Sequence, residues 1–259
     1  MNLPKIIFFD IDDTLYSKQK NHIPPSTYAA LSALKNKGVM IGIATGRSQA
    51  IFPPCVNDLV AKVGIDVLVT INGQYNQIQG KTVAHFPLSA AQITQTINYL
   101  KSQNLGYALM TADEIVVFNE SAAMILALTS LHITYRIADD FEDALVYQVL
   151  AFYDDNSTAH LPLDDTLKSI RWHTCGVDIL DAHGSKARGI KAALDELGLS
   201  MSQAWAFGDG LNDTEMLSMV GFGVAMGNAH THLKALADFV CPDIDDDGVF
   251  RGLTTLGVI

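Results

Sequence analysis

The chain has 259 residues, of which 49% are hydrophobic and 17% are charged, a balance that is typical of a folded globular protein rather than a disordered one. The length allows one large domain or two modest domains with a sizeable core. The formal net charge of −11 argues against nucleic acid and against an anionic membrane surface as partners.

The three cysteines, Cys55, Cys175 and Cys241, are far apart and form no C-x-x-C pair. This spacing predicts reduced thiols rather than disulfides or a structural metal site. The N-terminus lacks a basic segment followed by a long apolar one, and no run of about 18 apolar residues occurs anywhere. We therefore expect a cytoplasmic protein without a membrane-spanning helix.

The first predicted element is an unbroken apolar run, Ile6 to Phe9, that is typical of a strand buried on both faces of a parallel sheet. Asp10, Asp12 and Asp13 follow at once, so we expect Asp10 at the carboxyl end of the strand, where α/β sheets bind ligands. If the chain stays extended, Asp10 and Asp12 point the same way, and two such charges favour a divalent cation or a proton. The alternative is a solvated acidic turn.

Helix and strand signals alternate in the following residues. We expect a helix from a Ser26 cap to Lys37, with Gly38 as its stop, and then strands over 39–44 and 66–71. The alternation indicates βα units and an α/β fold, a Rossmann-like parallel sheet with helices on both faces.

The pattern changes near Phe86. A capping box at Ser89 begins a helix, and further signals give roughly the order helix, strand, strand, then again helix, strand, strand. The predicted elements after the first helix are strands 107–110 and 115–118, helix 122–131, and strands 147–152, 169–173 and 177–180. This order predicts an α+β domain inserted into the first fold, with a core at 1–85, the insertion at 86–182 and the rest of the core at 183–259.

The βα pattern returns after His183. Ser185 is expected to cap a helix that stops at Gly198, and a strand at 204–207 leads into a glycine- and acid-rich loop over 208–213. Strands of one parallel sheet deliver their following loops to one edge. We therefore expect the polar groups after the strands at 6–9, 39–44 and 204–207 to meet.

Four motifs occur in the order found in the haloacid dehalogenase-like superfamily, and the chain resembles its Cof-type, sugar-phosphatase-like branch. Asp10–Leu15 resembles motif I, and Thr45-Gly46 resembles motif II. Gly184-Ser185-Lys186 resembles motif III, and Gly208–Asp213, in the form G-D-x-x-N-D, resembles motif IV. Two departures stand out, since many members of the branch have glycine in place of Asp13 and in place of Ala187. The inserted domain is similar to the cap domain of this branch.

The resemblance implies a magnesium-dependent phosphatase with an aspartyl-phosphate intermediate. Asp10 would be the nucleophile and Asp12 the general acid and base. Mg²⁺ would be held by Asp10, by the backbone carbonyl of Asp12 and by Asp209. Asp213 would support the metal from behind these ligands or bind it directly. For Asp209, which precedes a predicted helix, a helix cap is the alternative.

The same resemblance implies a phosphate site, and Arg47 beside it is a candidate substrate contact. The residues implied for phosphate binding are Ile11, Thr45, Gly46, Lys186 and Asn212. A plain helix cap is the alternative for Thr45 and Gly46. Arg47 could bind phosphate with its guanidinium or could be a surface charge.

The sequence thus predicts hydrolysis of a small phosphate monoester in a phosphorylated metabolite. Sugar phosphates are the expected class, and flavin-type and pyridoxal-type phosphates stay open. One alternative is a phosphomutase that uses the same intermediate. Another is a receiver-like signalling module in which a phosphorylated aspartate is the message.

Overall fold

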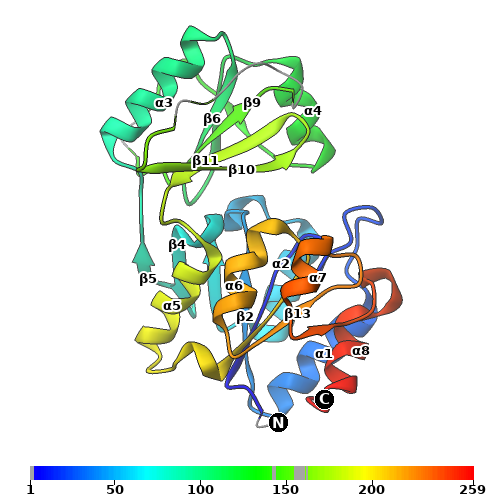
Figure 1. Cartoon of the computed structure of the whole chain (residues 1–259). Helices are drawn as coiled ribbons and strands as arrows, with labels where there is room; N and C mark the ends of the chain where they lie inside the picture. The colour runs from blue at the N-terminus through cyan, green and yellow to red at the C-terminus, as the bar shows by residue number, and fades with distance from the viewer. Residues whose placement is uncertain (1–2, 142–143, 155–160, 162) are drawn as a thin grey trace. The chain divides into compact units, whose positions relative to one another are not determined.

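The computed structural model describes residues 3–141, 144–154, 161 and 163–259. The chain divides into two compact units, coloured along the sequence in Figure 1. The core unit comprises Met1–Gly46, Phe52–His85 and Ser185–Ile259, and the inserted unit comprises Arg47–Ile51 and Phe86–Gly184. Within the described residues, no helix is both long enough and apolar enough to span a bilayer.

The core unit is built on one eight-stranded sheet in the order β14-β13-β12-β1-β2-β3-β4-β5. The central strand β1 pairs in parallel with β12 and with β2. The strand bounds are β1 Ile6–Phe9, β2 Met40–Ala44, β3 Val67–Thr70, β4 Tyr75–Ile78, β5 Lys81–His85, β12 Ala204–Gly208, β13 Phe222–Ala225 and β14 Phe239–Val240. The predicted α/β fold class is confirmed.

One edge of this sheet differs from the expected all-parallel arrangement. Strand β4 pairs antiparallel with β3, and β5 pairs antiparallel with β4, so that β4 and β5 form a hairpin. Gln79 and Gly80 make its two-residue turn, and both have positive φ, 48° and 77°, as tight hairpin turns require. The hairpin escaped sequence reading because its strands are polar, and such strands carry little hydrophobic signal.

The strand β1 lies at the centre of the apolar core. All four of its side chains are fully buried, as its apolar run predicts, and the ring of Phe9 stacks on that of Phe207 from the adjacent strand with centroids 5.0 Å apart. Phe8 faces Gly42 in the register of β1 with β2. A Cβ on Gly42 would lie 2.3 Å from the Phe8 ring, so this pair leaves no room for a methyl group.

Helices cover both faces of the core sheet. The connection from β1 to β2 and that from β12 to β13 run in opposite directions along the sheet, and right-handed crossovers then place α1 and α6 on opposite faces. Helix α8 packs on α1, and α5 packs on α6. The helix bounds are α1 Pro25–Asn36, α2 Pro54–Leu59, α5 Lys186–Glu196, α6 Thr214–Met219, α7 Thr231–Leu236 and α8 Gly248–Thr255.

The ends of two core helices test the expected caps. Ser185 caps α5 as predicted, because its Oγ accepts from the N–H of Arg188 at 3.1 Å. The expected cap of α1 by Ser26 is wrong. Pro24 occupies the N-cap position and Pro25 is the first helical residue. Because proline has no backbone N–H, one of the donors that a cap would satisfy is absent. The hydroxyl of Ser26 instead donates to Asp247 at 2.5 Å.

The inserted unit is an α+β fold, as expected. Its six-stranded sheet has the order β10-β11-β9-β6-β7-β8. The predicted capping box holds, since Ser89 and Gln92 bond reciprocally at the start of α3. An apolar cluster that includes Leu100, Tyr107 and Val149 fills the space beside the sheet. The bounds are α3 Ala90–Ser102, α4 Ala122–Ser130, β6 Gly106–Met110, β7 Ile115–Phe118, β8 Arg136–Ile137, β9 Gln148–Phe152, β10 Leu167–His173 and β11 Gly176–Asp181.

The contact between Phe8 and Gly42 predicts that Gly42→Ala lowers the free energy of unfolding by about 1–3 kcal/mol, because an added methyl overpacks the core. Urea unfolding followed by tryptophan fluorescence measures the loss. In the double variant Phe8→Leu with Gly42→Ala, the loss should be smaller than the sum of the two single losses, since leucine vacates the ring's position. A Gly42→Ala protein as stable as the wild type would contradict the close approach.

Candidate active site

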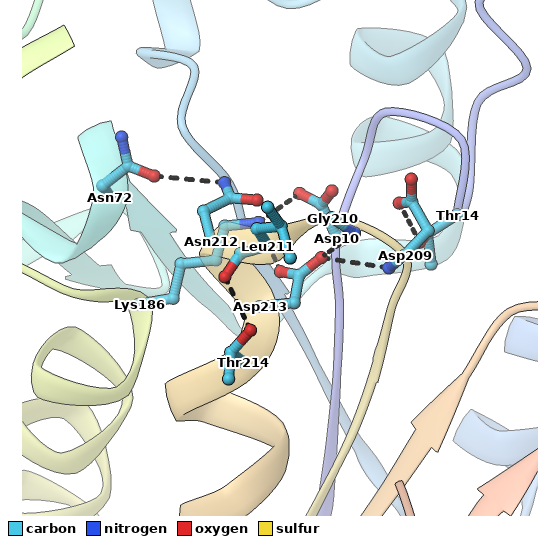
Figure 2. A network of polar contacts seen from close by, with 10 residues as sticks. All are labelled: Asp10, Thr14, Asn72, Lys186, Asp209, Gly210, Leu211, Asn212, Asp213 and Thr214. Carbon is cyan, nitrogen blue, oxygen red and sulfur yellow. Dashed lines mark hydrogen bonds and ion pairs between the residues drawn. The ribbon is translucent and has the colours of Figure 1, made fainter. Parts of the chain in front are cut away.

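Polar residues follow neighbouring parallel strands and lie at one edge of the core sheet. Asp10 comes directly after β1, Thr45 after β2 and Asp209 after β12. These three strands are adjacent and parallel, so their carboxyl ends meet. Figure 2 shows Asp10 and Asp209 in one polar network with Lys186 and Asp213. The predicted meeting of these loops therefore occurs.

Lys186 is a buried cation between two buried carboxylates. Its side chain is 1% exposed, and its Nζ lies 2.7 Å from an oxygen of Asp10 and 2.7 Å from an oxygen of Asp213. Burial alone would lower the pKa of Lys186, but the charges of Asp10 and Asp213 raise it above its ordinary value. Lys186 is the first residue of α5, where the helix dipole disfavours a cation, so the two carboxylates keep the ammonium in place.

Asp213 fixes the loop that carries Asp209. One oxygen of Asp213 contacts Lys186, and the other accepts from the N–H groups of Asp209 and Gly210, each at 3.0 Å. Gly208 makes room for this carboxylate, because a Cβ there would lie 2.6 Å from Cγ of Asp213. Both oxygens of Asp213 are thus occupied by the chain itself.

Asp209 points into the cluster rather than along the following helix. Its carboxylate accepts from the hydroxyl of Thr14 at 2.9 Å, and α6 has Asp213 at its cap position with no side-chain cap bond. The alternative interpretation of Asp209 as a helix cap is therefore wrong. Thr14, in the loop after β1, thus holds the carboxylate of Asp209, in the loop after β12.

Three carboxylates converge closely enough to share a cation. Within the described residues, Asp10, Asp209 and Asp213 form the one group of potential metal ligands, with one oxygen of each within 4.8 Å of the others. Burial raises the pKa of Asp10 from 3.8 to about 7, against the opposing charge of Lys186 and with help from Asp213 and Asp12. Burial, and then the charges of Asp10 and Asp213, raise the pKa of Asp209 well above its usual value.

These properties fit a hard divalent cation. The donors are carboxylate oxygens, which Mg²⁺ prefers. The raised pKa values mean that the buried acids lack enough positive charge to ionise easily, and a bound cation would supply that charge. One oxygen of Asp10 contacts Lys186 and one oxygen of Asp209 accepts from Thr14, so the chain itself holds both carboxylates in orientation.

The chain does not stay extended after β1, contrary to the assumption used for Asp10 and Asp12. It turns sharply, with the N–H groups of Leu15 and Tyr16 both donating to the carbonyl of Ile11 at 3.0 and 2.8 Å. Asp12 is half-buried in this turn. Its charge still contributes to the raised pKa of Asp10, so the two acids are near each other for a different geometric reason.

Thr45 and Gly46 lie beside Asn72, which sequence reasoning did not assign to the site. The N–H of Asn72 donates to the carbonyl of Thr45 at 2.9 Å, and its side-chain oxygen accepts from Nδ2 of Asn212 at 3.3 Å. A Cβ on Gly46 would lie 3.3 Å from the same oxygen. Asn72 thus links three of the loops. Its position directly after a predicted strand was the signal that could have found it.

Arg47 is not a surface charge. Its side chain is buried, and Nη1 donates to the carbonyl of Ile51 at 3.2 Å. Arg47 belongs to the inserted unit by its contacts, although it follows Gly46 directly. Its contact with a substrate stays a prediction.

The chain matches the family model described as haloacid dehalogenase-like hydrolase over residues 7–253. The chain belongs to this family. The family predicted from the four motifs is therefore confirmed, and the matched residues span both parts of the core and the insertion.

Several known proteins are similar to this chain along their whole length. A Bacillus subtilis protein named "Putative phosphatase YkrA" is 33% identical over 98% of both chains. The pyridoxal phosphate phosphatase YbhA of Escherichia coli is 27% identical over 95% of this chain and 96% of its own. Among solved structures, the subclass IIB sugar phosphatase BT4131 superposes with a TM-score of 0.89 at 29% identity, covering 98% of this chain and all of that one.

The pKa of Asp10 predicts how the metal-free protein responds to pH. The unfolded chain loses this proton near pH 3.8 and the folded protein near pH 7. Between these values the folded state binds more protons, so its stability falls as the pH rises, by at most about 1.4 kcal/mol per pH unit from this group. Thermal unfolding in EDTA from pH 4 to 8 should show this decline.

The matched variant Asp10→Asn should show a shallower decline, because its amide does not titrate. Added Mg²⁺ should reduce the decline in the wild type, since a cation favours the ionised carboxylates. A stability that instead rises through this pH range in EDTA, with no difference between the two proteins, would contradict the raised pKa.

Proposed function

We propose that this chain is a magnesium-dependent phosphatase that hydrolyses small phosphate monoesters through an aspartyl-phosphate at Asp10. The chain is a hydrolase of the haloacid dehalogenase-like family, and with phosphatases among its full-length relatives it is a phosphoric monoester hydrolase. The observation that carries the finer proposal is the contact of buried Asp10 with Lys186, beside Asp209 and Asp213.

Asp10 is the proposed nucleophile. One of its oxygens is held by the ammonium of Lys186 at 2.7 Å, so the carboxylate is fixed in orientation. The other oxygen attacks phosphorus, the ester bond to the leaving oxygen breaks, and the phosphoryl group becomes attached to Asp10. Lys186 also offsets the negative charge that the phosphoryl oxygens carry during transfer.

Asp12 is the proposed general acid and base. In the first step it gives a proton to the leaving oxygen, which departs as an alcohol. In the second step it takes a proton from water, whose oxygen attacks phosphorus and releases inorganic phosphate and free Asp10. Its half-buried position in the turn after β1 keeps it accessible to both the leaving group and water. Such proton transfers typically contribute roughly 10²–10⁴-fold to the rate.

Asp10, the backbone carbonyl of Asp12 and Asp209 are proposed to hold Mg²⁺. When bound, the ion neutralises the charge that opposes attack by a carboxylate on a phosphate. The occupied oxygens of Asp213 favour a supporting role for this residue over direct ligation, because both already bind Lys186 and the Asp209 loop.

The phosphate itself is proposed to lie among groups from several loops. These are Ile11, Thr45, Gly46, Lys186 and Asn212. The hydrogen bond from Asn212 to Asn72 supports the position of Asn212. Asn72 is proposed as the residue that orients it. Arg47 is proposed as a substrate contact on the basis of its position next to Gly46.

Sugar phosphates are the proposed substrate class, supported by likeness to a sugar phosphatase. Pyridoxal phosphate is the second candidate, because a relative that is similar over its full length is named for that substrate. The inserted unit, proposed as a cap domain over 86–182, would select between them. A screen of sugar phosphates, pyridoxal phosphate and flavin mononucleotide with Mg²⁺ would rank the classes by kcat/KM.

The product distinguishes a phosphatase from a phosphomutase. Free inorganic phosphate released in equal amount to the alcohol supports hydrolysis, whereas a phosphate moved to another hydroxyl of the sugar supports the mutase. Steady turnover of p-nitrophenyl phosphate excludes a receiver-like module, which would be phosphorylated once and hold the group.

We expect Asp10→Asn to abolish turnover of p-nitrophenyl phosphate and Asp12→Asn to lower kcat by roughly 10²–10⁴-fold. The control Asp195→Asn removes an exposed acid of α5 that pairs with Lys191 at 2.6 Å, and it should keep wild-type kcat. Circular dichroism of each variant checks that the fold persists. Retention of activity in a folded Asp10→Asn protein would refute the aspartyl-phosphate.

A further inference from the structure

The turn after β1 contains an aspartate, Asp13, in a backbone conformation that glycine adopts freely. Its φ is 57°, in the left-handed region that disfavours side chains. Its N–H donates to the carbonyl of Tyr16 at 2.7 Å, and its own carbonyl accepts from Nδ2 of Asn228 at 2.7 Å. The backbone of this residue is therefore fixed on both sides.

The carboxylate of Asp13 binds Lys18 through both of its oxygens. One oxygen accepts from the backbone N–H of Lys18 at 3.1 Å, and the other lies 2.8 Å from its Nζ. The two side chains are 30% and 40% exposed, so the pair lies at the surface of the turn and in contact with solvent. The acid and its cation come from the same short segment.

The charges of this pair act on the acidic cluster formed by Asp10, Asp209 and Asp213. Partial burial lowers the pKa of Lys18, but its hydrogen bond to Asp13 and then the charges of Asp13, Asp12 and Asp209 raise it overall. The charge of Asp13 is also among the contributions that raise the pKa of Asp209, after burial and the nearer acids. The geometry agrees, because Asp13 lies between Asp12 and Thr14 in the chain and the Thr14 hydroxyl donates to Asp209 at 2.9 Å. The pair therefore lies beside the acidic cluster.

We propose that Asp13 and Lys18 form a compensating charge pair that sets the balance between cation and phosphate binding at the acidic cluster. Lys18 is then a further positioning residue for the substrate. The inference rests on the proposed function. An uncompensated Asp13 would add a further negative charge beside Asp10, Asp12, Asp209 and Asp213, which attracts a metal ion and repels a phosphate dianion. An uncompensated Lys18 would do the reverse.

The pair predicts effects of opposite sign on two ligands. We expect Lys18→Met to weaken competitive inhibition by inorganic phosphate about fivefold and to tighten Mg²⁺ binding, measured by calorimetry without phosphate, by a similar factor. Asp13→Gly should do the opposite, and glycine suits the φ of this position. The double variant should return both affinities close to wild type, because the net charge of the turn is restored.

A matched control comes from the same segment. Lys20 pairs with Asp245 at 3.1 Å and is 50% exposed, so Lys20→Met removes the same charge two residues away. It should change both affinities by less than Lys18→Met does. Thermal unfolding of each variant identifies any loss of folded protein.

The outcomes distinguish a failure of the charge-pair proposal from a failure of the proposed phosphatase function. If Lys18→Met weakens both ligands, or leaves both unchanged, in a wild type that binds Mg²⁺ and turns over p-nitrophenyl phosphate, the charge pair is refuted and the phosphatase stands. If the wild type itself neither binds Mg²⁺ nor turns over, the proposed function is refuted and the inference is refuted with it.

Discussion

The ammonium of Lys186, held between Asp10 and Asp213, is the contact on which the rest of the site depends. Asp10 and Asp213 are buried and Asp209 is partly buried, and their ionised forms together are unfavourable without positive charge nearby. Lys186 supplies one such charge from 1% exposure. It also joins parts of the chain that are far apart, because Asp10 precedes the inserted unit and Lys186 follows it. The ion pair thus ties the first segment of the core to the last, and at the same time orients the proposed nucleophile.

The loops around this ion pair are positioned by close approach, which explains why glycine recurs at particular points. Gly73 has a φ of 81°, and a Cβ there would lie 2.0 Å from the carbonyl of Ser185, directly before Lys186. Gly208 leaves space for Asp213 in the same way. Both residues let a loop pack against the chain segment that carries the buried charges. The positions of those charges are therefore set by backbone packing and not by the flexible side chains alone.

The sequence predicted the strand ends and the acids that follow them, since hydrophobic runs that stop at charges mark where burial ends. Asp10, Asp209 and Lys186 meet as expected. The direction of Asp12 was not predictable, because a tight turn replaces the extended chain and its hydrogen bonds have no periodic signal. Asn72 was missed because a single amide after a strand is indistinguishable from a turn residue until its partner, 140 positions later, is seen. The β4–β5 hairpin was missed because its alternation is polar.

The charge distribution explains how an acidic chain could bind an anion. The protein carries a net charge of −11, and its proposed active site brings together more carboxylates than cations. Two lysines reduce this charge: Lys186 pairs with Asp10 and Asp213 in the interior, and Lys18 pairs with Asp13 at the surface of the turn. The five acids Asp10, Asp12, Asp13, Asp209 and Asp213 and these two lysines carry a formal charge of −3, of which a divalent cation would offset two. On the proposed function, a bound divalent cation would favour binding of a phosphate, and the paired lysines would set how much negative charge the cation has to offset.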